Sequence, residues 1–285
     1  MGAMGNAEHI TTPLNQIHEQ LFPLLERFGE PDAESELGRL SDHHRGAEVN
    51  VADSITSAMG TVACTAHTLA YLIEQDAAPR YVVAHASLIR QMLIGAYTVS
   101  YVLGPRDSAT RDERARTLVA AEYASSRRAA DAASKFKSDE VAIIRTAGEE
   151  WLEAVRSDRE DYQIAREAPD KTGAITVKGS QEFVELLVAV YRARDDNDEE
   201  MNARVMKNVP DAAEWAWQIT SGMAHAYHWP HRLTGDDDVP LLLPQIIEAI
   251  RAAGYLCIAA ASGTQSTFEE FQTELRGSLS PTSDG

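Results

Sequence analysis

The sequence predicts an all-α protein, a single multi-helix bundle of about eight or nine helices. Apolar residues recur at steps of three and four along several segments, which is the spacing of one face of an α-helix. The 285 residues include only 17 glycines and 11 prolines, and no glycine- and serine-rich linker divides the chain. We therefore expect one helical domain over residues 11–276, preceded by an expression scar and disordered start at 1–10 and followed by a disordered tail at 277–285.

Residues that favour helix ends separate the expected helices. Gly29 ends the first helix, and Pro79 suits the first turn of the third. Thr110 and Glu113 form a capping box for the fourth. The polar, acidic stretch 29–50 is expected to be a loop. In chain order, the predicted helices span residues 13–28, 53–75, 79–103, 110–135, 138–155, 180–191, 211–228, 239–262 and 267–275.

Two of these segments indicate how the bundle is arranged. In 53–75, the residues Ile55, Met59 and Val62 fall on one helical stripe. The segment 79–103 is apolar nearly all round, which is typical of a helix at the centre of a bundle. The one β-like stretch in the chain is 168–180, which could form a short hairpin or a lid.

The cysteines and the apolar segments predict a cytoplasmic protein that does not cross a membrane. Cys64 and Cys257 lie in apolar stretches and are expected to be buried small hydrophobes, because two cysteines cannot form a disulfide framework. The first thirty residues lack the basic and apolar regions of a signal peptide. Prolines and charged residues interrupt the longest apolar stretch, 239–262, which favours a core helix over a membrane span.

The formal charge is −18, from 26 basic and 44 acidic residues, and this argues against nonspecific nucleic-acid binding. The charge is uneven, because residues 80–137 contain ten Lys and Arg but five Asp and Glu, a local charge of +5. Such a strip can bind an anion, although a solvated helix face is the simpler interpretation.

Several catalytic motifs are absent from the sequence. It contains no GxxxxGK[ST] phosphate loop, no GxGxxG, no HExxH, no GxSxG and no Glu-x-x-His pair. The acidic run 195–200 has the carboxylates of a magnesium site but no convincing partner motif, so a solvated helix end is favoured. We expect no metal and no cofactor.

A histidine- and tryptophan-rich segment near residue 225 is the first candidate site. His225, His228 and His231 recur every three residues and fan across one side of a helix. Three metal ligands from one helix make poor geometry, and Pro230 breaks that helix, which disfavours a metal site. We instead predict a pocket for a small molecule, lined by Trp215, Trp217, Ser221, Tyr227, His228 and Trp229.

The second candidate combines an arginine with a histidine. Arg80 precedes His85 with four residues between them, and Arg39 precedes His44 in the same way. In RNA cleavage a histidine acts as acid or base, while a guanidinium stabilises the phosphorane charge.

Three runs in the sequence resemble those of uncharacterised actinobacterial helical proteins related to the HEPN superfamily. The resemblance covers about residues 50–230, although Ile94 and Tyr81 stand where the family pattern usually has a glutamate and another polar residue. The superfamily includes metal-independent ribonucleases of toxin and phage-defence systems. The matching runs are Ala86-Ser-Leu-Ile-Arg-Gln-Met-Leu-Ile-Gly-Ala-Tyr-Thr, Arg111 to Arg116, and Ser221-Gly-Met-Ala-His225.

The function predicted first is a noncatalytic helical protein that binds a small ligand or a protein partner in a Trp/His-lined pocket. The alternative, implied by the resemblance, is a HEPN-like ribonuclease or nucleotide-binding protein, with RNA as a partner only in that case. There Arg80 or Arg90 would bind phosphate, and His85 or His225 would act as acid or base. The resemblance also implies a homodimer, because HEPN-like domains resemble obligate pairs. Long apolar helices, which often supply isologous surfaces, favour the same expectation.

Overall fold

The computed structural model describes residues 3–27, 31–44, 49–75, 82–105, 107–138, 142–157, 214–223 and 243–261, together with positions 181 and 185. Within these ranges all regular structure is helical and no strand occurs, which confirms the all-α prediction. Residues 214–223 form one helix. The labelled helices are α1 (Ala3–Arg27), α2 (Glu36–His43), α3 (Val51–Glu74), α4 (Val82–Leu103), α5 (Ser108–Ala133), α6 (Ala142–Ser157) and α11 (Leu243–Ala261).

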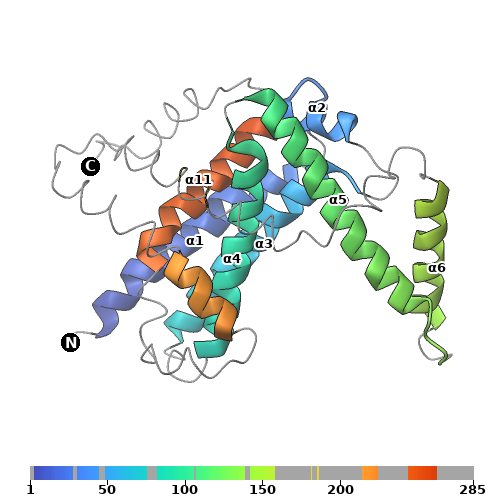
Figure 1. Cartoon of the computed structure of the whole chain (residues 1–285). Coiled ribbons are helices and arrows are strands. Elements are labelled where there is room, and N and C mark those ends of the chain that lie inside the picture. Colours follow the sequence, from blue (N-terminus) through green and yellow to red (C-terminus); the bar gives the residue numbers. More distant parts are fainter. Residues whose placement is uncertain are drawn as a thin grey trace.

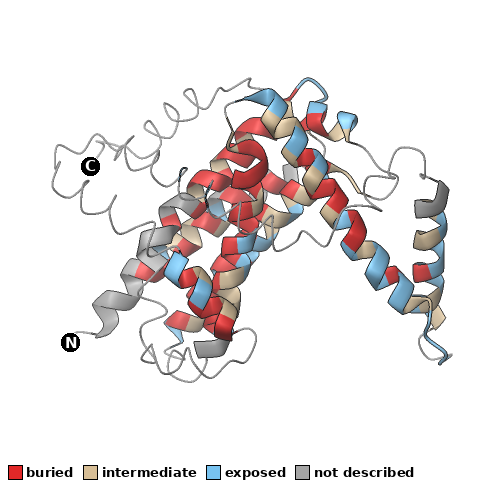
Figure 2. Cartoon of the chain, in the orientation of Figure 1, coloured by how far each residue is buried: buried red, intermediate tan, exposed pale blue. Residues whose placement is uncertain are grey.

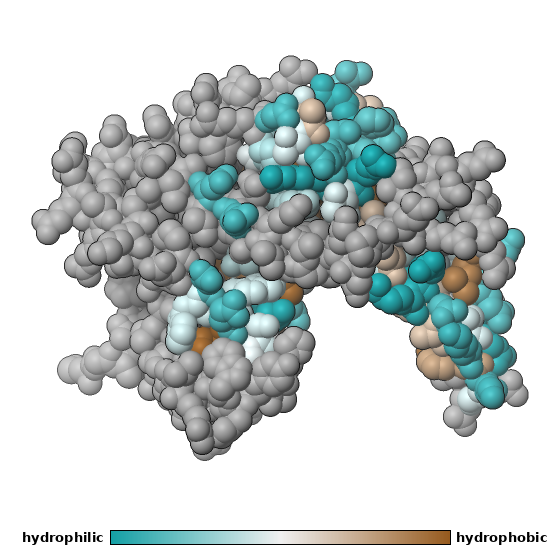
Figure 3. Space-filling view, in the orientation of Figure 1, coloured by the Kyte–Doolittle hydropathy of each residue, from teal (hydrophilic) through white to brown (hydrophobic). Residues whose placement is uncertain are grey.

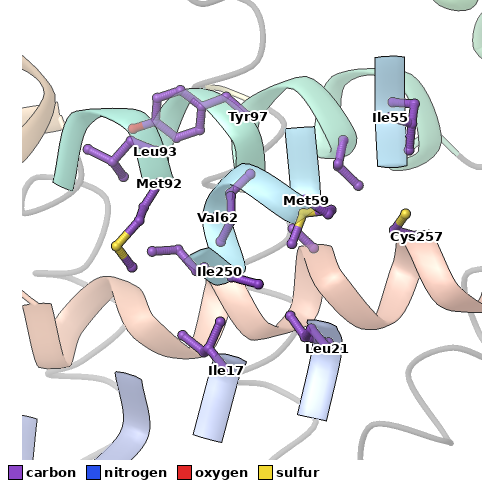
Figure 4. Close-up of a cluster of buried hydrophobic side chains, with 14 of the residues drawn as sticks. Ile17, Leu21, Ile55, Met59, Val62, Met92, Leu93, Tyr97, Ile250 and Cys257 are labelled. Atoms are coloured by element: carbon purple, nitrogen blue, oxygen red, sulfur yellow. The ribbon is translucent and has the colours of Figure 1, made fainter. Parts of the chain in front are cut away.

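Helices α1, α3, α4 and α11 form the body of the protein (Figure 1). α3 packs against α1 and α4, and α11 packs against α4 and α1. Their side chains interdigitate in a single apolar core. Figure 4 shows this core, in which Leu21 of α1, Val62 of α3, Leu93 of α4 and Ile250 of α11 converge, all of them buried.

Helix α5 starts beside this body and extends away from it, with α6 packed along its far half (Figure 1). The first part of α5 buries apolar residues such as Leu118 and Val119 against the core. Beyond them the helix is largely exposed (Figure 2), and Tyr123 meets Trp151 of α6 with ring centroids 5.6 Å apart. α6 also leaves Ile143 and Ile144 exposed. Figure 3 shows this part of the surface as mainly hydrophilic with a few hydrophobic patches.

The first helix, α1, is longer than the sequence predicts. α1 begins at Ala3, ten residues before Pro13, where the helix was expected to start. Ile10 is buried on the same stripe as Leu14 and Ile17, so packing against the body favours helix on both sides of the proline. Residues 3–10 are therefore helical.

The loop expected over 29–50 is interrupted by α2, so that prediction was wrong for residues 36–43. Ser35 caps this helix by accepting a hydrogen bond from the backbone N–H of Gly38 at 2.9 Å. Leu37 and Leu40, three residues apart, are buried against the body. A short amphipathic helix can form in a polar stretch because tertiary contacts supply most of its stability.

Two local predictions also need correction. Cys64 was expected to be buried but is exposed, because it shares the solvent-facing stripe of α3 with Thr61 and Thr68, whereas Cys257 is buried as expected. The cap of α5 is Asp107, which accepts a hydrogen bond from the N–H of Thr110 at 2.8 Å. The predicted Thr110 capping box is therefore replaced by an aspartate cap three residues earlier.

Among the helices that the structure describes, none is both long and apolar enough to cross a membrane. The β-like stretch 168–180, the acidic run 195–200 and the tail 277–285 lie outside the described residues.

Candidate functional site

The structure describes five of the ten predicted site residues. His85 and Arg90 lie on α4, and Trp215, Trp217 and Ser221 lie on the helix formed by residues 214–223. The other five fall outside the described residues: Arg80, His225, Tyr227, His228 and Trp229.

His85 lies inside the protein and not at its surface. Only 1% of the residue is exposed, and neither ring nitrogen has a hydrogen-bond partner among the described residues. Burial lowers the pKa of the imidazole below its ordinary value of 6.5, because the charged form loses its hydration. His85 is therefore a neutral core histidine at physiological pH, shielded from a ligand in solvent.

Arg90 and Trp217, predicted for two different sites, lie in contact. The guanidinium carbon of Arg90 lies 4.3 Å from the centroid of the Trp217 ring, which is cation–π geometry. The Trp217 ring also meets Tyr97 of α4 with centroids 5.4 Å apart. Arg90, Tyr97 and Trp217 thus form one cluster, here called the arginine–aromatic cluster, which joins the helix of residues 214–223 to α4.

The cluster is partly removed from water, since Tyr97 is buried and Arg90 and Trp217 are half-buried. Burial lowers the pKa of Arg90, and Nη1 of its guanidinium has no hydrogen-bond partner within the described part of the chain. Burial, and to a lesser extent the charge of Glu214, raises the pKa of the Tyr97 hydroxyl. Trp215 is 41% exposed, two residues from Trp217, and Ser221 is half-buried. The two described tryptophans therefore have different surroundings.

A groove of about 440 Å³ lies between α3, α4 and α5. Its α3 side is made of small polar residues, among them Asn50, Ser54, Ser57 and Thr61. Gln91, Ile94 and Thr98 come from α4, and Glu122 comes from α5. The volume falls within the range of small-molecule sites.

Gly95 allows α3 and α4 to approach closely at this groove. A Cβ atom at this position would lie 2.5 Å from Cγ2 of Val62 and 2.7 Å from the backbone oxygen of Ala58. Gly95 and Ala58 both line the groove, so this contact sets how near the two helices come. A larger residue would push them apart.

The groove is acidic. Asp53 and Glu122 supply carboxylates, and no lysine, arginine or histidine occurs among the described residues that line it. Burial of the carboxyl raises the pKa of Glu122 above its ordinary value, although the residue as a whole stays solvent-exposed. Asn50 caps α3 and also donates a side-chain hydrogen bond to Asp53, which fixes this corner of the groove.

The groove and the arginine–aromatic cluster lie on neighbouring sides of α4. Arg90, Ile94 and Tyr97 follow one another at steps of four and three and so share one helical stripe. Ile94 of this stripe lines the groove, while Arg90 and Tyr97 contact Trp217. Ile94 is also one of the few large apolar residues of the described chain that are exposed.

The chain matches no protein-family model, and neither a curated protein nor a solved structure is significantly similar to it. The geometry described above is therefore the basis for assigning a function.

Sequence reasoning did not predict the groove. Its polar lining residues resemble ordinary solvent-facing positions of amphipathic helices, and only the packing of three helices brings them together. One signal was available: Gly95 interrupts an apolar helix, and a glycine there often marks a close approach.

Proposed function

We propose that the protein is a noncatalytic α-helical binding protein that takes up a small, positively charged organic ligand in the groove between α3, α4 and α5. The observation that carries this proposal is the pair of carboxylates, Asp53 and Glu122, in a lining that has no basic side chain among its described residues. The predicted Trp/His-lined pocket stays a prediction, because half of its residues lie outside the described ranges.

The shape and chemistry of the groove favour an elongated polyamine. Its α3 side runs from Asn50 to Thr61, which is roughly 16 Å at about 1.5 Å per helical residue. Hydroxyl and amide groups along this length can accept hydrogen bonds from ammonium groups. Val49 and Ile94 offer apolar surface for methylene segments. A linear polyamine combines these two kinds of group.

Several features of the lining support binding without catalysis. Ser54 and Ser57 have no histidine or lysine beside them among the described lining residues, so an activated serine nucleophile lacks its base. The hydroxyl of Thr61 already donates to the backbone oxygen of Ser57 at 2.9 Å, and that of Thr98 donates to Ile94 at 2.9 Å. These hydroxyls therefore keep their oxygens free as acceptors.

Calorimetric titration of the full chain with spermidine, at physiological salt, tests this function. We expect saturable binding of one molecule per chain. Glu122→Gln should weaken it about fivefold, because one charge pair near a surface is worth roughly 1 kcal/mol. Binding should also weaken as the pH falls and Glu122 becomes protonated.

Glu113→Gln is the matched control, because this residue lies on α5, is exposed and does not line the groove. It makes the same change in net charge and should leave the affinity unchanged. An equal loss in both variants, or a titration that never saturates, would show only general attraction of polyamines to an acidic protein and would overturn the proposal.

A cytoplasmic location belongs with this proposal. Both cysteines are free, Cys64 at the surface and Cys257 in the core, and an exposed free thiol suits a reducing compartment. The homodimer and the ribonuclease alternative stay predictions.

A further inference from the structure

Two histidines and an aspartate meet where α2 ends and α5 begins. His43 is the last residue of α2, His44 is its C-cap, and Asp112 lies in the second turn of α5. Nδ1 of His43 lies 2.6 Å from Oδ1 of Asp112, and Nε2 of His44 lies 2.9 Å from the same oxygen. The two imidazole rings lie beside each other, with centroids 4.6 Å apart. The three atoms that could bind a metal ion, Nδ1 of His43, Nε2 of His44 and Oδ1 of Asp112, therefore lie close together.

We propose that His43, His44 and Asp112 bind a divalent transition-metal ion such as Zn²⁺. Two imidazole nitrogens and a carboxylate oxygen are the ligand types of many zinc and non-haem iron sites. The three ligand atoms all lie within 4.8 Å of one another. None of the three residues lines the groove, so this site is independent of the proposed polyamine site.

The two histidine–aspartate pairs need only a small adjustment to hold an ion. In a tetrahedral zinc site, bonds of 2.0–2.2 Å place neighbouring ligand atoms roughly 3.3 Å apart. The observed separations of 2.6 and 2.9 Å are hydrogen-bond distances, in which protons occupy the space between the groups. A metal ion would replace these protons and separate each pair by about half an ångström.

The surroundings hold two ligands in place and leave the third accessible. The side chain of His44 is 10% exposed and that of Asp112 is 37% exposed, whereas that of His43 is 69% exposed. The ion would therefore be held on the protein side by His44 and Asp112 and approached from the side of His43. Three protein ligands leave a further coordination position for water, as in catalytic zinc sites.

A second set of charges holds α2 against α5 beside the site. Glu36 of α2 pairs with Nε of Arg111 at 3.1 Å, and it also pairs with Arg39 at 2.6 Å. Arg111 is the neighbour of Asp112 in the sequence, so this ion pair fixes the start of α5 beside α2.

Asp112 can supply the anionic ligand of such a site. An aspartate carboxyl is ionised at neutral pH, as metal coordination requires. Both histidines lie within hydrogen-bond distance of its Oδ1.

Zinc titration of the chelator-treated full chain tests the site. Calorimetry near neutral pH should show one Zn²⁺ bound per chain, and Co²⁺ should give the visible absorption of a site with nitrogen and oxygen ligands. Asp112→Asn and His44→Gln should each weaken Zn²⁺ binding at least about tenfold, which is typical even of lost outer-sphere partners. Both variants keep a polar side chain that can still form hydrogen bonds, so the helices should stay together.

Two control variants separate this site from other metal-binding groups. Glu113→Gln changes the carboxylate next to Asp112, and Cys64→Ser removes an exposed thiol elsewhere. Both should bind Zn²⁺ like the unchanged chain. The proposal is overturned if no ion binds, or if Asp112→Asn and His44→Gln bind Zn²⁺ as tightly as Glu113→Gln. In either case the three residues would serve only as a hydrogen-bonded connection between α2 and α5.

Discussion

α4 and α5 are consecutive helices of similar length, 22 and 26 residues, but they have opposite surroundings. α4 carries one arginine and no acidic residue, and the body encloses it on most sides (Figure 2). α5 carries acidic and basic residues along its whole length and is largely exposed beyond the body. Packing therefore positions α4 along its whole length, whereas the far half of α5 depends more on intrahelical hydrogen bonds and on α6.

In both regions a glycine allows two helices to approach closely. Gly95 of α4 lies against α3, and Gly148 of α6 lies against α5, where an added Cβ would come within 2.8 Å of the backbone oxygen of Ala130. At Gly95 the contact is in the body and forms part of the groove. At Gly148 the contact lies on the projecting α5–α6 pair. The same feature therefore supports global stability in one region and local structure in the other.

Of the substitutions considered in these helices, Gly95→Ala should have the largest effect on stability. The new Cβ would clash with backbone at Ala58, so α3 and α4 must separate, at a cost of about 1–3 kcal/mol in the free energy of unfolding. Urea denaturation measures this loss. Spermidine affinity should fall as well, because the groove changes shape.

Gly60→Ala provides the control for this prediction. Gly60 lies on α3 with nothing within 4 Å of an added Cβ, so alanine should stabilise the helix by about 0.5–1 kcal/mol. If both variants were stabilised, the close contact at Gly95 would not limit the packing of α3 and α4.

His85→Leu should have an intermediate effect, and it would be stabilising. The imidazole is buried without a hydrogen-bond partner among the described residues, so an apolar side chain of similar size removes a desolvation cost. We expect a gain of about 1 kcal/mol in chemical denaturation. The same variant also tests the ribonuclease alternative, in which His85 is a candidate acid or base. Loss of a measured RNA-cleaving activity in His85→Leu without a loss of stability would contradict a purely structural role for His85.

The pH dependence of His85 follows from its lowered pKa. Between that lowered value and about 6.5 the unfolded chain binds a proton at this residue and the folded chain does not. The free energy of unfolding therefore falls as the pH drops below about 6.5 and stops falling below the folded-state pKa. His85→Leu should lose this contribution and show a flatter profile. Identical profiles for the two proteins would mean that His85 titrates alike in both states.

Periodic apolar patterns predicted the body well. The expected segment 53–75 differs from α3 by two residues at its start and one at its end, because its stripe is long and regular. The region 36–43 was missed because α2 has only eight residues and buries little more than Leu37 and Leu40. Its formation depends on contacts with distant segments, which a local pattern does not contain.

The candidate sites were harder to predict than the helices. Arg90 and Trp217 were singled out individually, but their contact joins segments more than 120 residues apart. Asp112 meets His43 and His44 across 69 and 68 residues, and only after α2 has formed. The adjacent histidines were visible in the sequence, whereas the third ligand depended on where α5 begins.

A substitution of Asp107, the cap of α5, should change stability less than Gly95→Ala or His85→Leu. Hydrogen bonds from the hydroxyl and then the backbone N–H of Thr110 lower the pKa of its carboxyl below the ordinary 3.8. The ionised form therefore adds stability that is fully present above about pH 3.8 and is lost as the pH falls through the lowered pKa.

Asp107→Asn keeps a capping oxygen but has no negative charge to interact with the helix dipole. It should be slightly less stable than the unchanged chain at neutral pH, and the difference should vanish in acid. Hydrogen exchange at the first turn of α5 measures this difference, because that turn frays when its cap is weakened. α4, by contrast, is held by packing. A difference that stayed constant from neutral to acidic pH would show that the charge of Asp107 does not stabilise α5.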